Sequence, residues 1–363
     1  MLDPNVWAEV PFWFWSLVLF TFGCLVGSFL NVCIHRLPRG ESIVSPPSHC
    51  PHCGYSIPWY LNIPLATWVY LRGRCANCRA PISVRYLVVE LCTGLAFLGC
   101  WLRFGSGAPW LALAYCLVLA GFIVATCIDF EHFIIPDGIT LGGVVAGFLC
   151  SFALPSLHGE TRAASGLLAS ALGIGVGGGS VFLIVQLGKL AFGRQKVKLA
   201  PASRIIFTES LLVLPDEEVL YEELFFRKSD TIRVEARTVE LPDRCYWNVP
   251  VRLRQDRLRI GDEEFKPEDV PHLEVVADAI VLPREAMGLG DVKFMAAIGA
   301  FLGWQATLFS LMFSSVLGAA VGLSLIALRK REWSSRLPYG PYIAAAATVW
   351  LFAGRKVVAL FLP

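Results

Sequence analysis

Eight runs of apolar residues follow one another along this chain, each about long enough to form a membrane-spanning helix. A hydrocarbon core of about 30 Å needs roughly 20 apolar residues in a helix. The runs occupy residues 12–34, 86–104, 109–128, 139–155, 164–192, 292–305, 306–328 and 340–361. A tight turn near Phe301–Trp304 is predicted, because one helix over 292–328 would overshoot the membrane. The pattern predicts an all-α polytopic membrane protein with about eight transmembrane helices.

The composition agrees with this class. Hydrophobic residues make up 55% of the 363 residues and charged residues 17%, which is outside the range of soluble globular proteins. The net charge of +2 gives no reason to expect a nucleic-acid partner. The first run follows Asp3 and Glu9 and not Lys or Arg, so it is interpreted as a retained helix and not a cleaved signal peptide.

The distribution of basic residues predicts the orientation in the membrane. Lys and Arg gather in the segments 35–85 and 329–336, and such segments remain in the cytoplasm. The alternation of spans then places residues 129–138 and 193–291 on the cytoplasmic side as well. All the polar segments of interest are therefore expected on one face of the membrane.

Residues 193–286 differ from the rest of the chain, because they carry more than half of its charged residues. Apolar and polar residues alternate over 231–241 and 249–260, which predicts half-buried strands. Residues 215–220 have the sequence pattern of the start of a short helix, because a proline and acidic residues stand in the first turn. We expect a small α+β or β-rich cytosolic insertion; a partly disordered charged linker is the alternative.

These observations divide the chain into five segments. They are a first transmembrane helix (1–34), a cytosolic cysteine-containing segment (35–85), helices 2–5 (86–192), the charged insertion (193–286) and helices 6–8 (287–363).

Two cysteine pairs stand in the first cytosolic segment. Cys50 and Cys53 form one Cys-x-x-Cys pair, and Cys75 and Cys78 form the other. This spacing is typical of a structural four-thiolate Zn²⁺ site, which leaves no open coordination position for catalysis. Disulfides or unligated thiols are the alternative, and a reducing cytosol disfavours disulfides. His49 and His52 are further possible ligands, although the cysteines already complete the shell.

Two aspartates are predicted to lie at the same depth on the cytoplasmic face. Asp129 immediately follows the third apolar run, and Asp291 immediately precedes the run that starts at 292. A carboxylate at such a position is costly unless it is paired or lines a water-filled cavity. Two adjacent carboxylates share a proton, which is the state that an aspartic protease uses. Gly288 and Gly290 would let the backbone open and an extended substrate approach.

Each acidic residue also has a structural interpretation. Asp291 could cap a helix or pair with Lys293, whereas capping explains Asp129 poorly, because an acid at a helix C-terminus opposes the dipole. Asp137 follows a proline, and an N-cap role is favoured for it. The neighbouring Glu131 and His132 are interpreted as solvated interface residues.

Glycines at four-residue spacing recur within the predicted helices. The pairs are Gly143 and Gly147, Gly173 and Gly177, and Gly175 and Gly179. Such spacing allows close helix packing in lipid. A phosphate-binding loop is disfavoured, because no Lys-Ser or Lys-Thr follows the glycines.

Taken together, these motifs resemble the type IV prepilin peptidases, the bifunctional leader peptidase/N-methyltransferases of the GxGD aspartyl protease family in bacterial inner membranes. The resemblance extends over the chain except for 193–285. It includes Gly27–Val32 with His35–Gly40, the cysteine pairs, Ile82–Tyr86 with Glu90-Leu91, Asp129–Asp137, Met287–Lys293 and Leu337–Pro341. Leu87 stands where this family usually has a proline.

The resemblance implies cleavage of a basic leader from prepilins or pseudopilins after a glycine, at the cytoplasmic membrane surface. It further implies methylation of the new N-terminus from S-adenosylmethionine. The catalytic residues would be Asp129 and Asp291, and Gly288, Gly290, Lys293 and Asp137 would support the active site. For the methyl donor the residues suggest only Glu90 and Gly94, since no glycine-rich nucleotide-binding turn is found.

The sequence alone is compatible with two other functions. A general intramembrane protease of the signal-peptide-peptidase type would not need the zinc segment. A non-enzymatic transporter or assembly scaffold could place the aspartates on an ion path. For the insertion we expect a regulatory role or the docking of pilus or secretion assembly proteins.

Overall fold

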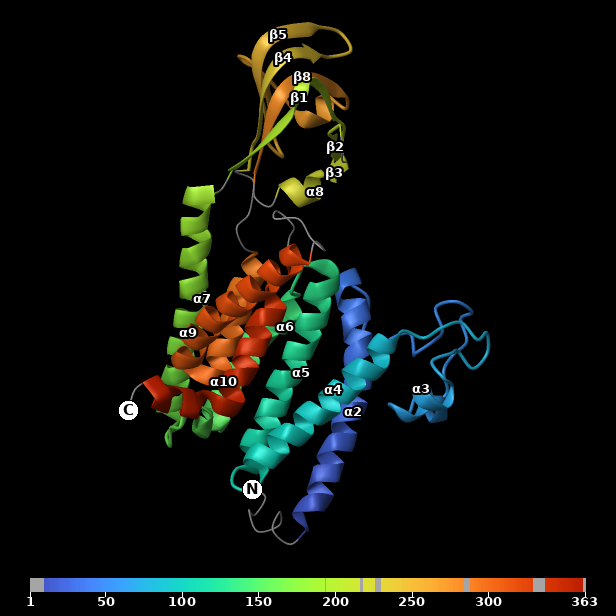
Figure 1. Ribbon diagram of the computed structural model, residues 1–363, viewed down its shortest axis with the longest axis vertical. Helices are drawn as coiled ribbons and strands as arrows, with labels where there is room; N and C mark the ends of the chain where they lie inside the picture. The colour runs from blue at the N-terminus through green and yellow to red at the C-terminus, as the bar shows by residue number, and fades with distance from the viewer. Residues whose placement is uncertain are drawn as a thin grey trace. The chain divides into compact units, whose positions relative to one another are not determined.

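The computed structural model describes residues 10–192, 194–215, 218–225, 230–283, 288–328 and 337–361. The chain forms two compact units (Figure 1). A helical unit contains the described residues up to Phe182 and from Leu289, and a second unit contains Leu183–Gly288.

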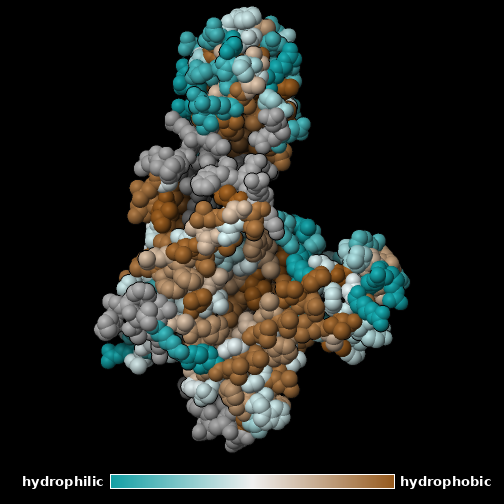
Figure 2. All heavy atoms as spheres, in the orientation of Figure 1, coloured by the Kyte–Doolittle hydropathy of each residue, from teal (hydrophilic) through white to brown (hydrophobic). Residues whose placement is uncertain are grey.

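The helical unit consists of apolar helices and short connections. Its elements are α2 (Phe12–Arg36), η1 (Leu37–Arg39), η2 (Trp59–Leu61), α3 (Ala66–Tyr70), α4 (Val84–Cys100), η3 (Trp101–Gly105), α5 (Pro109–His132), α6 (Asp137–Ala153), η4 (Pro155–His158), α7 (Ala163–Phe192), α9 (Leu289–Ala327) and α10 (Gly340–Phe361). Among the described residues, α2, α4 with η3, α5, α7 and α9 are long and apolar enough to cross a membrane, and α6 and α10 are shorter apolar helices. Figure 2 shows hydrophobic residues over the visible surface of these helices. The helices are those of a multi-pass membrane protein.

The longest helix, α9, changes direction at Gly303, where φ is +80° and ψ is 174°. This backbone conformation is open to glycine and strained for other residues. Ser151 of α6 and Ser170 of α7 both donate hydrogen bonds to the carbonyl oxygen of Ala300, at 3.2 and 3.0 Å. These hydroxyls satisfy a carbonyl that lies one turn before the break. The turn predicted near Phe301–Trp304 is thus confirmed.

Glycines allow α6 and α7 to pack closely against α9. A Cβ on Gly173 would lie 2.1 Å from the carbonyl oxygen of Gly299, and one on Gly177 would lie 2.4 Å from that of Met295. Gly143 and Gly147 likewise face Ala297 and Ala300. The prediction of close packing is wrong for Gly175 and Gly179, because a Cβ at either position would meet nothing within 4 Å. These two glycines lie on a face of α7 that no described residue covers.

The pair formed by α2 and α4 positions the cysteine-containing segment that connects them. The two helices pack along one another, with Gly27 of α2 so close that a Cβ would lie 2.7 Å from Cα of Glu90. Gly94 of α4 packs against Cys24 and Phe20 in the same way. The buried face of α4 therefore brings Glu90 to the end of this pair from which the cysteine-containing segment extends.

The helix α7 ends in the second unit, which contains its residues from Leu183 onward. The rest of this unit is a single antiparallel sheet of eight strands in the order β3-β2-β1-β8-β4-β5-β6-β7. The strands are β1 (Arg194–Phe207), β2 (Leu211–Val213), β3 (Glu218–Leu220), β4 (Ile232–Glu240), β5 (Cys245–Leu253), β6 (Leu258–Ile260), β7 (Glu263–Phe265) and β8 (Leu273–Pro283), with short helices α8 (Tyr221–Leu224) and η5 (Pro267–Asp269). Its core includes Ile205, Val239, Val275 and Ile280, all fully buried. The unit thus has a hydrophobic core of its own.

Two sequence expectations for this unit were wrong in detail. Strand structure was expected over 249–260, but a turn that was not expected divides it: Arg254 N–H donates to Arg257 O at 2.8 Å, and β5 and β6 pair across this turn. A helix was expected over 215–220, where residues 216 and 217 lie outside the described residues. Residues 218–220 form β3, because they pair with β2. The helical turn follows at α8.

Candidate active site and metal centre

Asp129 lies at the C-terminal end of α5, 5% exposed. Its Oδ2 accepts a hydrogen bond from the N–H of Gly340, the first residue of α10, at 2.8 Å. A Cβ on Gly340 would lie 2.8 Å from this oxygen and 3.1 Å from Ile135 Cδ1. Glycine at this position therefore allows the α10 backbone to reach the carboxylate.

Asp291 lies in the first turn of α9, half-buried. The preceding residue, Gly290, packs against the turn between α5 and α6: a Cβ there would lie 3.5 Å from Ile135 Cβ and 3.6 Å from Ile135 N. Ile135 thus contacts both the residue before Asp291 and the residue that binds Asp129. Gly288, which precedes α9, is exposed, and Met287 of the sequence motif lies outside the described residues.

The same two helices also meet deeper in the bundle. Phe122 of α5 and Phe294 of α9 pack edge to face, with ring centroids 5.6 Å apart. The structure consequently brings together the end of α5, the turn 133–136, the first turn of α9 and the first residue of α10. Gly340 and Ile135 stand within motifs shared with the prepilin peptidases, but nothing in the sequence indicated a contact of either residue with Asp129.

Asp137 and Lys293 form an ion pair, with Oδ1 and Nζ 2.6 Å apart. The N-cap role favoured for Asp137 is wrong: Pro136 occupies the N-cap position of α6, and Asp137 follows as its first helical residue. Lys293 therefore joins the first turns of α6 and α9. Since the Asp137 side chain is 61% exposed, the ion pair contributes at most about 1 kcal/mol to the free energy of folding. Its main effect is to fix the geometry of these two turns.

Glu131 is not simply a solvated residue, as the sequence had suggested. Its carboxylate forms an ion pair with Arg85 at the start of α4. The next acid after Asp129 is therefore engaged with a different helix.

The four cysteines lie at the tips of two similar turns. In the first, Cys50 N–H donates to Tyr55 O at 3.0 Å, and in the second Cys75 N–H donates to Ala80 O at 2.8 Å. The four Sγ atoms all lie within 4.8 Å of one another, and Cys50 Sγ and Cys78 Sγ are 3.8 Å apart. Tetrahedral thiolates at a Zn–S distance of about 2.3 Å are about 3.8 Å apart. The cluster has the geometry of a metal site, and no histidine belongs to it among the described residues.

The backbone of the second turn favours the thiolate form that a metal requires. Hydrogen bonds from the backbone of Cys78 and Asn77 lower the pKa of Cys75 to about 6, whereas the neighbouring cysteine thiols raise the pKa of Cys78 to about 11, so that Cys75 ionises first. A thiolate at neutral pH binds metal without first losing a proton.

A cavity of about 550 Å³ lies between the cysteine segment, α2 and α4. This volume is within the usual range for small-molecule sites. Asn31, 1% exposed, lines it; its Nδ2 donates to Gly27 O and Tyr86 O, whereas its Oδ1 has no partner among the described residues. Trp68 Nε1, also in the lining, likewise has none there. Both residues line the cavity, and each carries a buried polar atom without a partner among the described residues, which is uncommon in folded proteins outside functional sites.

Glu90 is in the lining too, and its Oε2 accepts the N–H of Leu65 at 2.8 Å. Gly94 is not in the lining, because it packs between α2 and α4. Asn31 was not singled out from the sequence, although an asparagine within an apolar helix is a feature that indicates function.

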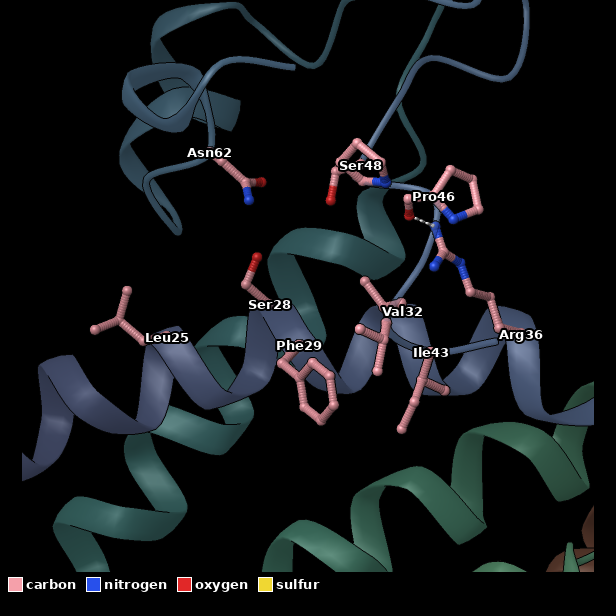
Figure 3. Close-up of a pocket in the computed structure, with 11 residues that line it drawn as sticks. Leu25, Ser28, Phe29, Val32, Arg36, Ile43, Pro46, Ser48 and Asn62 are labelled. Carbon is pink, nitrogen blue, oxygen red and sulfur yellow. Dashed lines mark hydrogen bonds between the residues drawn. The ribbon is translucent and has the colours of Figure 1, made fainter. Parts of the chain in front are cut away.

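A smaller cavity of about 270 Å³ adjoins the first on the outer side of α2. Figure 3 shows the side chains of Ser28, Ser48 and Asn62 pointing toward the same space, above α2. All three also line the larger cavity. Arg36 fixes the loop beside them by donating to Ser42 O and Pro46 O, at 2.9 and 2.7 Å.

Comparisons with known proteins agree with these two regions. The Bacterial Peptidase A24 N-terminal domain matches residues 21–104, and the Type IV leader peptidase family matches residues 274–323. A protein of Aeromonas hydrophila named prepilin leader peptidase/N-methyltransferase is 30% identical over 97% of this chain and 95% of its own length. Proteins of the same name from Myxococcus xanthus and Pseudomonas aeruginosa are 31% and 26% identical, over 86% and 94% of this chain and 63% and 91% of their own lengths. No solved structure matches the chain.

The similarity to the Aeromonas protein covers nearly the full length of both chains, and the two matched families cover the cysteine segment and the Asp291 motif separately. The chain belongs to the prepilin leader peptidase/N-methyltransferase family.

Proposed function

We propose that this protein cleaves the leader from type IV prepilins or pseudopilins and then methylates the new N-terminal amine. The position of Asp129 is the main support for leader cleavage. Its carboxylate accepts a hydrogen bond from Gly340 and lies beside Ile135, and Gly290 packs on the same Ile135 side chain. The acid at the end of α5 and the acid at the start of α9 thus belong to one neighbourhood of the fold.

Asp129 and Asp291 are the proposed catalytic pair. An ionised carboxylate takes a proton from water, whose oxygen attacks the carbonyl carbon of the scissile peptide. The protonated partner donates to the carbonyl oxygen, and the leaving nitrogen is protonated as the carbon–nitrogen bond breaks. Gly288, exposed before α9, leaves room for an extended substrate backbone. Gly290 lies within α9, so the opened backbone expected at this glycine is not found, and its missing side chain instead accommodates Ile135. Lys293 and Asp137 hold the two helix starts in place.

Replacement of each aspartate tests this assignment. Asp129→Asn and Asp291→Asn should each lower the rate of prepilin cleavage by roughly 100-fold to 10,000-fold, because each loses general acid–base function. Glu131→Gln is the matched control, since it removes the neighbouring negative charge and should retain most activity. Cleavage is followed by mass spectrometry of the pilin in purified membranes. Retained cleavage in either Asn variant would count against the pair.

The four cysteines are proposed to hold a structural Zn²⁺ ion that stabilises the segment 35–85. Their thiolate geometry and the low pKa of Cys75 support this. Metal analysis should find about one zinc per chain in the wild type and none after Cys50→Ser with Cys75→Ser. Methylation should be lost in this variant while cleavage is largely retained. An unchanged metal content would contradict the assignment.

The larger cavity is the proposed site of the methyl donor, S-adenosylmethionine, which supplies an electrophilic methyl group when bound. Asn31 Oδ1 and Trp68 Nε1 can accept from and donate to its polar groups, and the Glu90 carboxylate suits a cationic ligand. Asn31→Leu should weaken donor binding about tenfold, because a hydrogen bond to a buried group is lost. Equilibrium binding of the donor to the detergent-solubilised protein measures this.

We further propose eight membrane spans in the bacterial inner membrane, with α9 counted twice because of its turn at Gly303. The active site and the cysteine segment would face the cytoplasm. Basic residues of 35–85 support this orientation; the second basic segment, 329–336, lies outside the described residues. Labelling of Cys245, an exposed cysteine outside the proposed zinc site, by an impermeant thiol reagent from each side of sealed vesicles tests the orientation.

The sheet unit is proposed to dock pilus or secretion assembly proteins, or to regulate cleavage. Its separate core and its many exposed charges support a role in binding. Deletion of residues 196–283 should reduce cleavage of some substrates and not of others. Unchanged cleavage of every substrate would oppose this role.

A further inference from the structure

We infer that the smaller cavity admits the acceptor amine: the N-terminal end of an apolar, membrane-embedded helix enters it from the lipid side of α2 and meets the methyl donor at Ser28, Ser48 and Asn62. This inference rests on the proposed methyltransferase function and goes beyond it, because it assigns a second substrate site and its route of entry.

A methyl transfer between two substrates requires two sites that meet at the reacting atoms. The two cavities share a wall of six residues: Ser28, Val32, Arg36, Pro46, Ser48 and Asn62. The larger cavity alone reaches Asn31, Trp68 and Glu90, and the smaller alone reaches Leu25, Phe29 and Ile43. The side chains that can recognise a polar ligand thus line the larger cavity, and apolar side chains line the smaller cavity on the other side of the shared wall.

The outer side of the smaller cavity opens at an apolar surface. Leu25 and Phe29 of α2 are 52% and 49% exposed, on a helix that is apolar enough to cross a membrane. Val44, on the loop that covers the cavity, is 86% exposed. A water-soluble acceptor would gain nothing from this entrance, whereas an apolar helix lying in the bilayer keeps its side chains in an apolar environment as it approaches.

The shared wall suits an amine. Ser28, Ser48 and Asn62 each carry an oxygen that accepts a hydrogen bond, and Figure 3 shows them converging. An N-terminal amine has two or three N–H donors and fits such a group. Arg36, the cation in this wall, is turned toward the carbonyls of Ser42 and Pro46, so that its donors are engaged with the loop.

The chemistry needs an uncharged amine. The ammonium form first gives up a proton, and the Glu90 carboxylate, which interacts with Ser28, can accept it. The amine nitrogen then bonds to the methyl carbon, and the carbon–sulfur bond breaks with its electron pair remaining on sulfur. The positive charge passes from sulfur to nitrogen, so atoms and charge balance. Ser28 is therefore a positioning residue between the acceptor amine and Glu90.

The test narrows the lipid-side entrance without touching the donor site. Leu25→Trp places a larger apolar side chain at a position that lines only the smaller cavity. Leu17→Trp is the matched control, because Leu17 lies on the same helix, is 58% exposed and lines neither cavity. Leader cleavage, donor binding and methylation of the cleaved pilin are all measured with the full-length protein in lipid bilayers.

We expect Leu25→Trp to methylate at least tenfold more slowly than Leu17→Trp, with cleavage and donor binding equal in the two variants. A photoreactive phenylalanine analogue at position 25, and not at position 17, should cross-link to the cleaved pilin. Equal methylation by both Trp variants, or cross-linking at both positions alike, would overturn the inference and leave the proposed function standing. A wild-type protein that binds no donor and does not methylate would overturn both.

Discussion

Gly340 controls the surroundings of the Asp129 carboxylate, because its N–H binds Oδ2 and its missing side chain leaves room for that contact. Gly340→Ala would place a methyl group 2.8 Å from Oδ2 and 3.1 Å from Ile135, so the carboxylate must move. We expect prepilin cleavage to fall about 100-fold, as it does when a catalytic group is displaced by about 1 Å.

Gly138→Ala is the matched control, since a Cβ there meets nothing within 4 Å in the first turn of α6. Both variants are compared in initial cleavage rates at equal amounts of folded enzyme. Equal rates would show that the Asp129 carboxylate tolerates a displacement and that its contact with Gly340 is unimportant.

The two cysteine turns offer a second test at single positions. Gly54 and Arg79 both adopt positive φ, +69° and +61°, after the second cysteine of each turn. A side chain costs about 1 kcal/mol or more in this conformation. Gly54→Ala should therefore weaken metal binding about fivefold to tenfold, and Arg79→Gly should strengthen it similarly. Competition with a chromophoric chelator measures both; changes in the same direction would contradict the strain argument.

The sequence indicated the acids and the cysteines, because charged groups beside apolar runs and paired Cys-x-x-Cys motifs are conspicuous. It did not indicate Gly340 or Ile135, since a backbone N–H and an aliphatic side chain carry no chemical signature. The ion pair between Asp137 and Lys293 could not be predicted from the sequence either, because the two residues are distant in the chain and either could form a local contact.

At the scale of helices, the packing of α7 on α9 depends on a direct contact of two backbones. Gly173→Ala would place a Cβ 2.1 Å from Gly299 O, and neither helix can yield without losing other contacts. We expect a loss of about 1–3 kcal/mol in the free energy of unfolding. Gly175→Ala, two residues away on the open face, should be neutral or slightly stabilising.

Thermal unfolding in detergent, with both variants and the wild type, distinguishes these expectations. Similar losses of stability in the two variants would mean that Gly173 is not required for the packing of α7 on α9. The pair is well matched, because both changes are Gly→Ala in the same helix.

Element boundaries were predicted where physical limits are strict. A bilayer fixes the length of a helix, so a turn near Gly303 could be expected before its conformation was known. The strand boundaries were less accessible: the turn at 254–257 has the sequence Arg-Gln-Asp-Arg, without Gly, Pro or Asn. Its four successive polar residues interrupt the alternating pattern, but they are the only signal that the strand ends there. Similarly, glycine spacing alone could not tell that Gly175 and Gly179 face away from α9.

At the scale of the whole molecule, the sheet unit is joined to the rest at two adjacent points. Arg194 and Pro283, near its two ends, are directly paired across β1 and β8, and its core is formed within the unit. We expect residues 194–283 to fold when expressed alone, with one cooperative transition. Within it, Ile280→Ala should cost about 2–5 kcal/mol, whereas Trp247→Ala, at a side chain that is 71% exposed, should change stability little.

Denaturant unfolding of the isolated unit and its two variants measures these effects. A gradual, non-cooperative transition would favour the charged-linker interpretation of this segment. The composition had revealed the insertion as a separate region, because its charge density differs so sharply from that of the helices. Its strand order could not be predicted, since β1 pairs with β8 across most of the unit's sequence.

The central claim is that Asp129 and Asp291 act together on one peptide bond. The most direct measurement is an experimental structure of the protein with a prepilin peptide whose scissile bond is replaced by a hydroxyethylene group, which mimics the tetrahedral intermediate. We predict that its hydroxyl lies within about 2.6–3.2 Å of a carboxylate oxygen of each aspartate. A hydroxyl in contact with only one of the two, or with neither, would contradict the account.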